Sequence, residues 1–501
     1  MKRIQNLLGL LMGMAALPAM AQTVNITVSS GRLHTITGFG AAAMSGPMAP
    51  INDVSVIDKL YGPDSEVGLN ILRMEVSPNT IGDVTTPWDT PYDWHGFLPA
   101  VKRARQYGAI IFAAPWSPPA SFKTNNSARG QLADGTIGKL RRDKYKDFFP
   151  WLNTFMRYMR NNGAPVDVVS IQNEPDWHPD YSGCYYTPQE LDTLVREYGS
   201  RFDKSSGVKL MSGEALGYTP NYYAPTLNDS EARQYIDLLG GHTYGHAPFK
   251  YMKHAAAMAA PYGIGAWMTE HIVDPRADTD GDSQSDTKVR DLPTWHEQLL
   301  FAEDVNETML AGGSAYVYWY MVSHYSFIGS GETTIQPGNT YGKVLDRGRI
   351  MGQFARHLVG ATMLDRNSSI NKEAQTFESS AFIKGDSLIV NAIDTLPRPL
   401  TLNLVLPYKA ISGERITSTE GHIGITETLL VEAPTQRFSL PIPARSFSTF
   451  IFRIDRSATG ISEPVCMPRM VDDAWYNLQG QRVARPQRGI YIHQGHQVVV
   501  R

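Results

Sequence analysis

The sequence predicts an α/β protein built as a (β/α)8 TIM barrel with a C-terminal β-sandwich. Eight short apolar runs alternate with helical segments up to about residue 320, and from about Gly360 the pattern changes to short strands of alternating polarity. Apolar strands that do not alternate are typical of parallel sheets covered on both faces, and eight of them interleaved with helices indicate a barrel. The alternative, a doubly wound sheet, is disfavoured because no glycine-rich phosphate-binding turn follows an early strand.

Each of the eight apolar runs has the length of a barrel strand. The runs are Ile36–Gly40, Leu69–Val76, Ala109–Trp116, Val166–Asn173, Lys209–Ala215, Ile236–Tyr244, Ala266–His271 and Ser314–Met321. Amphipathic segments between the runs predict helices at Asp143–Arg160, Pro188–Phe202 and Pro293–Leu310.

Beyond residue 360 helical periodicity is absent, and turn residues separate strands of alternating polarity, as in a β-sandwich. These strands are predicted at Ser380–Lys384, Ser387–Ala392, Pro399–Leu406, Gly424–Val431 and Ser446–Arg453. An isolated strand of the same pattern, Val24–Ser29, precedes the barrel. We therefore expect an N-terminal strand within 22–35, a barrel over 36–359 and a sandwich over 360–456.

Residues 457–501 are predicted to be a linker followed by a small strand-rich module. The stretches Trp475–Gln481 and Gly489–Ile492 resemble the short terminal modules of exported Bacteroidetes proteins, some of which serve sorting or surface attachment. The alternative is an ordinary accessory pair of strands.

The first 21 residues have the features of a signal peptide. Lys2 and Arg3 form a basic start, Leu7–Leu17 is an apolar stretch too short to span a bilayer, and Ala19-Met20-Ala21 is an A-x-A cleavage site. No cysteine follows the site, so a lipoprotein anchor is not indicated. We expect an exported protein that acts in the periplasm, at the cell surface or outside the cell.

Composition excludes several classes of function. The 501 residues carry a net charge of −3, which gives no electrostatic case for nucleic acid or an anionic membrane surface. No second apolar stretch reaches the roughly 20 residues of a membrane-spanning helix. The two cysteines, Cys184 and Cys466, are too few for a zinc site, and their separation in sequence does not support a disulfide. Oligomeric state is left open.

Two of the predicted strands have a glutamate at their carboxyl end. Glu174 directly follows the fourth run, and Glu270 is the last residue but one of the seventh. Because the catalytic groups of such barrels lie at the carboxyl ends of the strands, both side chains are expected at one mouth. Paired carboxyl groups can cleave a glycosidic bond when one holds a proton and the other stays ionised. Asn173, just before Glu174, is placed to hydrogen-bond a sugar 2-hydroxyl.

These residues resemble the clan of retaining glycosidases on (β/α)8 barrels, and within it glycoside hydrolase family 30. The resemblance covers about residues 24–455. It rests on seven motifs, each at a different predicted strand: Gly38-Phe39-Gly40, Leu72-Arg73, Pro115–Pro119, Ser170–Trp177, His242-Thr243-Tyr244, Trp267–His271 and Tyr316–Tyr320. Members of this family carry a β-sandwich that includes the N-terminal strand, which matches Val24–Ser29.

The resemblance implies a role for each matching residue. Glu174 is expected to be the general acid/base and Glu270 the nucleophile. The residues expected to bind substrate or hold the nucleophile are Arg73, Trp116, Asn173, Tyr244 and Trp319. No cofactor and no metal are implied, and the expected partner is a polysaccharide of the xylan type.

The segments Trp116–Asn125 and Thr269-Glu270-His271 look most like the xylanase branch, which cuts β-1,4-xylan internally. Many of those enzymes recognise a glucuronate side group with arginines after strand eight, whereas Met321–Ser326 contains none. The sequence therefore leaves the side-group requirement open, since a guanidinium fork suits a carboxylate better than His or Ser. The alternatives are β-1,6-glucan, a β-glucoside, or a non-catalytic glycan-binding protein.

The acidic segment 278–286 resembles a calcium loop in the spacing of its acids, but its glycine is not at the sixth position and no closing glutamate follows. A solvated loop near the cleft is expected there.

Overall fold

The computed structural model describes residues 22–43, 53–78, 94–245, 247–273, 294–331, 338–369 and 377–455, and four short strands between 475 and 500. The predicted signal peptide, the acidic segment 278–286 and Cys466 lie outside the described residues. Residues up to Asp455 form one compact unit, and the segment from Arg456 onward forms a second.

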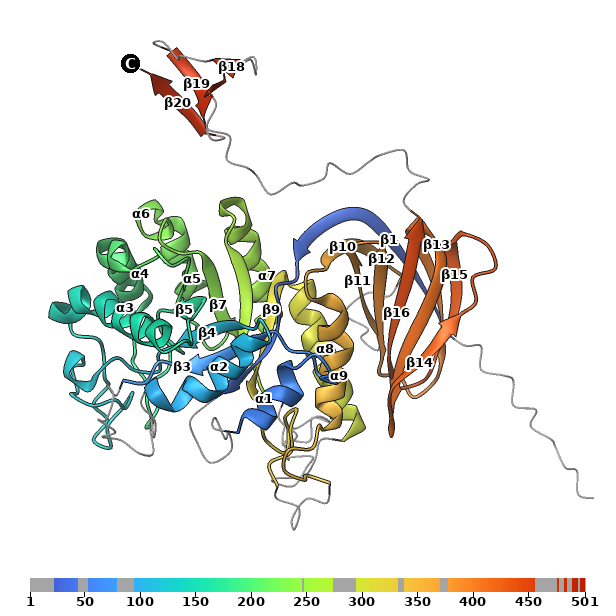
Figure 1. The fold of residues 1–501 in the computed structure, drawn as a ribbon, viewed down its shortest axis with the longest axis horizontal. Helices are drawn as coiled ribbons and strands as arrows, with labels where there is room; N and C mark the ends of the chain where they lie inside the picture. The colour runs from blue at the N-terminus through green and yellow to red at the C-terminus, as the bar shows by residue number, and fades with distance from the viewer. Residues whose placement is uncertain are drawn as a thin grey trace, which may run out of the picture. The chain divides into compact units, whose positions relative to one another are not determined.

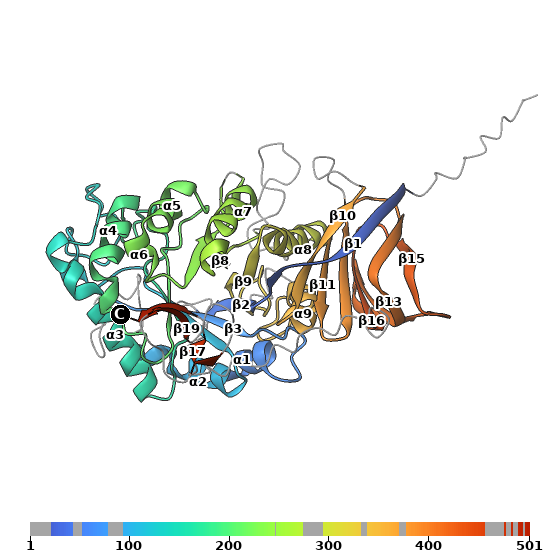
Figure 2. The same cartoon turned by 90° about the horizontal axis from the view of Figure 1, so that it is seen from above.

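Eight parallel strands close into a barrel, as the sequence predicts (Figures 1 and 2). They are β2 (Gly38–Ala43), β3 (Ile71–Glu75), β4 (Ile110–Ala114), β5 (Val168–Ser170), β6 (Lys209–Met211), β7 (Leu238–His242), β8 (Gly265–Glu270) and β9 (Gly313–Tyr320). Each predicted run overlaps one strand. Pairing of β2 with β9 closes the circle, and alternate side chains of the strands fill the interior with residues such as Phe112, Met211 and Trp267.

Helices surround the barrel. They are α1 (Val54–Tyr61), α2 (Leu98–Gln106), α3 (Tyr145–Asn161), α4 (Pro188–Tyr198), α5 (Pro220–Asn228), α6 (Ser230–Arg233), α7 (Pro248–Ala259), α8 (Trp295–Leu310) and α9 (Asp346–Leu358), with 3-10 turns η1 (Trp94–Phe97), η2 (Ala120–Phe122), η3 (Arg142–Lys144), η4 (Gly199–Arg201) and η5 (Ala260–Tyr262). Capping boxes begin α4 at Thr187 and α8 at Thr294. Each threonine side chain accepts from the backbone N–H of the glutamate three residues later, and that glutamate's side chain accepts from the threonine's backbone N–H.

The predicted one-sided pattern of 293–310 does not describe α8. Its polar residues are buried as well as its apolar ones, including Gln298, Asp304 and Asn306. The reason is its place in the fold, because α8 lies between the barrel and the β-rich domain (Figures 1 and 2). Asn306 Nδ2 donates to Glu378 Oε2 at 3.0 Å across that boundary.

The β-rich domain follows α9. Its strands are β10 (Thr362–Ser368), β11 (Phe377–Lys384), β12 (Ser387–Asp394), β13 (Leu400–Thr419), β14 (His422–Leu429), β15 (Thr435–Ile442) and β16 (Ser446–Asp455). The N-terminal β1 (Gln22–Thr35) pairs antiparallel with β10 and parallel with β13, which confirms that the first strand returns to this domain. The domain has its own apolar core, which includes Val24, Ile26 and Leu402.

Strands β10 and β15 were not predicted, and β13 is much longer than the predicted Pro399–Leu406. The first part of β13 pairs with β1 and β15, and from Lys409 onward the strand pairs mainly with β16 and β14, with one further β15 pair at Ala410. The strand therefore continues through a proline that would ordinarily mark its end, because it changes partners there.

The second unit contains an antiparallel sheet in the order β18-β17-β19-β20. Its strands are β17 (Trp475–Tyr476), β18 (Arg482–Val483), β19 (Gly489–His493) and β20 (His496–Val500). Within the described part of the chain, no helix is long and apolar enough to cross a membrane.

Candidate active site

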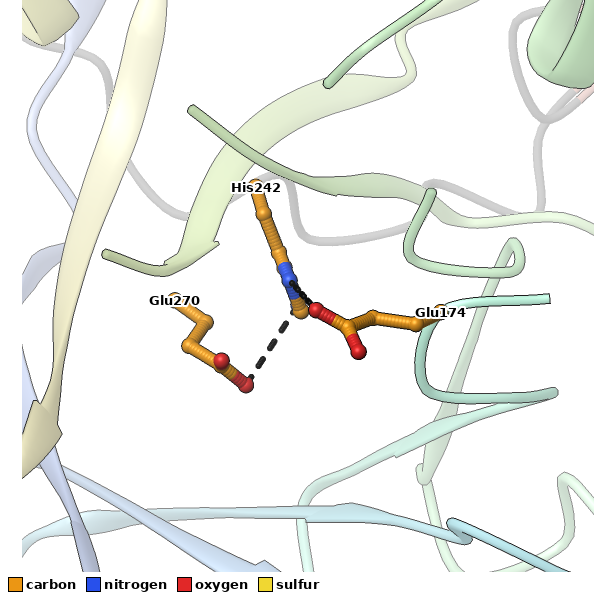
Figure 3. A group of neighbouring side chains, drawn as sticks. All are labelled: Glu174, His242 and Glu270. Atoms are coloured by element: carbon orange, nitrogen blue, oxygen red, sulfur yellow. Dashed lines mark hydrogen bonds and ion pairs between the residues drawn. The ribbon is translucent and has the colours of Figure 1, made fainter. Parts of the chain in front are cut away.

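The carboxyl ends of four barrel strands bring three glutamates and a histidine together. Glu174 follows β5, Glu214 follows β6, His242 ends β7 and Glu270 ends β8. Figure 3 shows the imidazole of His242 between the carboxyl groups of Glu174 and Glu270. One oxygen from each of these glutamates and a nitrogen of His242 lie within 4.8 Å of one another. The two glutamates expected at one mouth from the sequence are therefore neighbours.

Arg73, in β3, holds the base of this cluster. Its Nη1 donates to Glu270 Oε2 at 2.7 Å, and its Nη2 donates to Asn173 Oδ1 at 2.6 Å and to Glu214 Oε2 at 3.1 Å. The guanidinium is fully buried. Burial alone would lower the pKa of Arg73, but the charges of Glu214 and Glu270 outweigh it and raise that pKa. Arg73 is thus a fixed cation that orients three acceptors at once.

His242 is the second cation of the cluster. Its Nδ1 lies 3.1 Å from Glu174 Oε1, and its Nε2 lies 3.7 Å from Glu270 Oε2 and 3.8 Å from Glu214 Oε2. Burial would lower the pKa of the imidazole, but Glu270 and its two carboxylate neighbours raise the pKa to about 10. At neutral pH the ring is therefore an imidazolium between carboxyl groups.

Glu174 has a left-handed backbone, with φ of 46°. This conformation is unfavourable for a residue with a side chain and is found where the surrounding structure enforces it, often at active sites. The Glu174 N–H donates to the carbonyl of Glu214 at 2.9 Å, and Pro175 then turns the chain away from the barrel. The strained backbone places the Glu174 carboxyl beside His242.

Glu270 and Glu214 are buried carboxyls with the same two cations nearby. Burial raises the pKa of Glu270, and His242 and Arg73 oppose that rise. For Glu214, burial would raise the pKa, but Arg73 and His242 outweigh it and lower the pKa. Glu214 is fully buried, so it is a compensating charge beneath the site and does not reach the cleft.

Tyr244 approaches the other oxygen of Glu270, with 3.3 Å between its hydroxyl and Glu270 Oε1. Burial, followed by the charge of Glu270, raises the pKa of this phenol well above its usual value. The hydroxyl therefore stays protonated and donates to the carboxylate.

The two tryptophans expected to wall the cleft differ in exposure. Trp116 is only 6% exposed and packs over the Arg73 guanidinium, 4.7 Å from ring centre to Cζ. Trp319 is half-buried, 5.8 Å from the Trp116 ring and 5.9 Å from the same guanidinium. The structure thus places Trp116 mainly against Arg73, a cation–π contact, and leaves Trp319 the more accessible of the two.

Sequence reasoning assigned no role to Glu214 or His242. Both lie near the carboxyl ends of predicted runs, Lys209–Ala215 and Ile236–Tyr244, at the same barrel face as Glu174 and Glu270. A charged or titratable residue at a strand end was the signal that could have found them.

Glu174, His242 and Glu270 also have the spacing of a metal-ligand set. Arg73 already lies 2.7 Å from a Glu270 oxygen, so a second cation there would be repelled. The donor set suits acid–base chemistry better than a metal.

Cys184 is fully buried, and burial raises the pKa of its thiol to about 11. It forms no disulfide with any residue that the structure describes. Pairing of Cys184 with Cys466, which the sequence leaves open, is not tested because Cys466 lies outside the described residues.

Comparison with known proteins agrees with this geometry. Residues 88–262 match the model of the glycosyl hydrolase family 30 TIM-barrel domain. The glucuronoxylanase XynC of Bacillus subtilis (strain 168) is 28% identical over 459 residues, covering 89% of this chain and 96% of that protein. Among solved structures, the family 30 subfamily 8 xylanase Xyn30A of Clostridium acetobutylicum has a TM-score of 0.68 at 28% identity, covering 86% of this chain and 99% of its own.

A family 30 endoxylanase of Clostridium papyrosolvens C71 also has a TM-score of 0.68, at 25% identity, with 86% of this chain and 100% of its own covered. The barrel and its paired glutamates, with these comparisons, define a glycoside hydrolase. Residues 88–262 are thus the part of the chain that the family 30 TIM-barrel model describes.

Proposed function

We propose that the protein is an exported, retaining endo-β-1,4-xylanase that does not require a glucuronate side group. The observation that supports the mechanism is the short distance between Glu174 and Glu270, because one carboxyl oxygen of each lies within 4.8 Å of the other. Retaining glycosidases place the two carboxyl groups about 5–5.5 Å apart, whereas inverting enzymes leave about 6.5–9.5 Å for a water molecule.

In this proposal Glu270 attacks the anomeric carbon while Glu174 protonates the departing oxygen. Asn173 accepts from Arg73 through Oδ1, which leaves its amide nitrogen to donate to the sugar 2-hydroxyl. Water then attacks the glycosyl-enzyme ester, with Glu174 now acting as base.

The position of His242 fits both steps. When the ester forms, Glu270 loses its negative charge and Glu174 gains one by giving up its proton. The imidazolium lies 3.1 Å from Glu174 and 3.7 Å from Glu270, so it can stabilise whichever carboxylate is ionised. The charge of the cluster stays constant through the step.

Exposed aromatic rings near Glu174 support a polymeric substrate. Trp177 is 46% exposed and Tyr181 45% exposed, three and seven residues after Glu174. Aromatic faces of this kind stack on sugar rings. They lie on the loop that carries the general acid, which is the side where a leaving chain would continue.

The side-group preference follows from the segment after β9. His324 is 6% exposed and Ser326 is fully buried, so neither offers the arginine fork that a carboxylate favours. Xylan is proposed because the similar proteins named above are xylanases. Export rests on the first 21 residues, and N-terminal sequencing of protein secreted by its host should begin at Gln22.

Product analysis tests the proposal on glucuronoxylan, arabinoxylan and unbranched xylo-oligosaccharides, with Glu270→Gln as the control. We expect internal cleavage of all three with retained anomeric configuration, and no cleavage by the variant. Cleavage of glucuronoxylan alone would contradict independence from glucuronate. No cleavage of any xylan would overturn the substrate, and β-1,6-glucan is then the polymer to examine. Tight binding of glycans without cleavage would indicate a binding protein.

A further inference from the structure

His271 follows the proposed nucleophile directly, and the proposed mechanism gives it no role. Its Nδ1 lies 2.9 Å from Asp304 Oδ2, in the middle of α8. The same Asp304 oxygen accepts from the hydroxyl of Tyr316 at 2.5 Å. Two donors on a carboxylate that is 7% exposed fix both partners, and a proton must lie on Nδ1 of His271 to make its bond.

The ring fixed in this way supports Tyr244. The His271 and Tyr244 rings meet edge to face, with centroids 5.0 Å apart at 63°. On another side, the His242 ring meets Tyr244 at 5.8 Å and 81°. Tyr244 is thus held between two imidazoles, and it needs such support because it is half-buried and precedes Gly245, which has a left-handed φ of 84°.

We propose that Asp304 and His271 form a positioning pair that directs the hydroxyl of Tyr244 at Glu270. The contacts run without a gap from Asp304 to His271, to Tyr244 and to Glu270 Oε1. The inference rests on the proposed function, since it takes Glu270 as the nucleophile. His271 touches no reacting atom in this account and acts only through Tyr244.

A crystal structure of His271→Phe tests the positioning directly. We expect the Tyr244 hydroxyl to move more than about 3.5 Å from Glu270 Oε1, beyond hydrogen-bonding distance. A hydroxyl that stays at 3.3 Å would overturn the proposal. If His271→Phe does not fold, Asp304→Asn serves in its place, because it keeps both rings and removes only the charge that fixes them.

A double-mutant cycle tests the same pair in catalysis. His271→Phe and Asp304→Asn should each lower kcat about 10- to 100-fold on an aryl β-xyloside, with KM changed by less than about threefold. In a Tyr244→Phe background, which lacks the hydroxyl, the further loss should be below about threefold. Equal losses in both backgrounds would contradict the proposal, because His271 would then act by another route.

His254 provides a matched control. Its Nδ1 lies 2.8 Å from the hydroxyl of Tyr223, with the rings 6.1 Å apart, on the outer layer of the barrel. His254→Phe removes the same kind of histidine–tyrosine contact and should leave kcat unchanged. The crystallographic result needs no substrate. A displaced Tyr244 in a protein that cuts no xylan would therefore reject the substrate and keep the positioning pair.

Discussion

Two clusters of buried glutamates in this protein differ in what compensates their charge. At the barrel mouth, Glu174, Glu214 and Glu270 surround two cations, Arg73 and His242. Between the barrel and the β-rich domain, Glu303 and Glu307 of α8 meet Glu378 of β11, whose carboxyl accepts from the amide of Asn306. Burying a carboxylate is unfavourable unless a cation or a proton neutralises it.

The pKa directions follow that difference. Burial and the neighbouring Glu307 raise the pKa of Glu378 to about 9, and burial raises the pKa of Glu303 to about 7. Arg73 and His242 instead lower the pKa of Glu214, against the effect of burial. Glu378 in the second cluster is therefore kept neutral by a proton, while Glu214 in the first stays ionised beside fixed cations. The same cations oppose the rise in the pKa of Glu270 and so favour the carboxylate that the proposed nucleophile needs.

The largest effect is expected for the nucleophile. Glu270→Gln should lower kcat about 10⁴-fold or more, because an amide cannot form the glycosyl ester. Hydrolysis of xylo-oligosaccharides measures the loss. Glu378→Gln is the matched control, since it makes the same exchange in the neutral cluster and should keep full activity. Comparable losses in both variants would mean that the two clusters do not differ in function.

The division of labour between the two mouth glutamates can be tested with a leaving group that needs no proton. Glu174→Gln should still form the glycosyl-enzyme from a dinitrophenyl β-xyloside, seen as a burst of phenolate, and then stall about 10²- to 10⁴-fold below the wild type. Glu270→Gln should give no burst. A burst in Glu270→Gln and none in Glu174→Gln would reverse the two roles.

A smaller effect is expected for the buried third carboxylate. Glu214→Gln should lower kcat about 10- to 100-fold, because one of the three acceptors that orient Arg73 loses its negative charge. It should also lower the pKa of His242 from about 10, since one of the carboxylates that favour the imidazolium is gone. The alkaline limb of the pH–rate profile should therefore move to lower pH. Glu303→Gln is the control, and a profile unmoved in Glu214→Gln would contradict the role of this charge.

The sequence predicted the eight strands because each is an apolar run, and it placed Glu174 and Glu270 because strand ends of a barrel share one face. Glu214 and His242 lie in predicted runs, but periodicity does not say which residue of a run faces the cluster. An isolated β-bridge between Asn173 and Glu214, outside the regular strands, places Glu214 beside the residues of the site. Asp304 could not be found, since it reaches the site from α8, whose pattern is obscured by burial on both sides.

The smallest effect is expected on folding stability, through the buried carboxyl of Glu378. The folded-state pKa of Glu378 is about 9 against a usual value of 4.5, so the folded protein holds a proton that the unfolded chain releases above pH 4.5. The contribution of Glu378 to the free energy of unfolding should therefore be largest at or below pH 4.5 and should fall as the pH rises toward 9.

Glu378→Gln removes this dependence, because the amide mimics the protonated acid at every pH. The variant should gain on the wild type from pH 5 to pH 9, reaching more than about 1 kcal/mol in unfolding free energy. Urea unfolding at pH 5, 7 and 9 measures the difference, with Glu432→Gln as a control in which an exposed carboxyl after β14 is exchanged. A difference between Glu378→Gln and the wild type that does not change with pH would mean that Glu378 is ionised like Glu214, and the contrast between the two clusters would be lost.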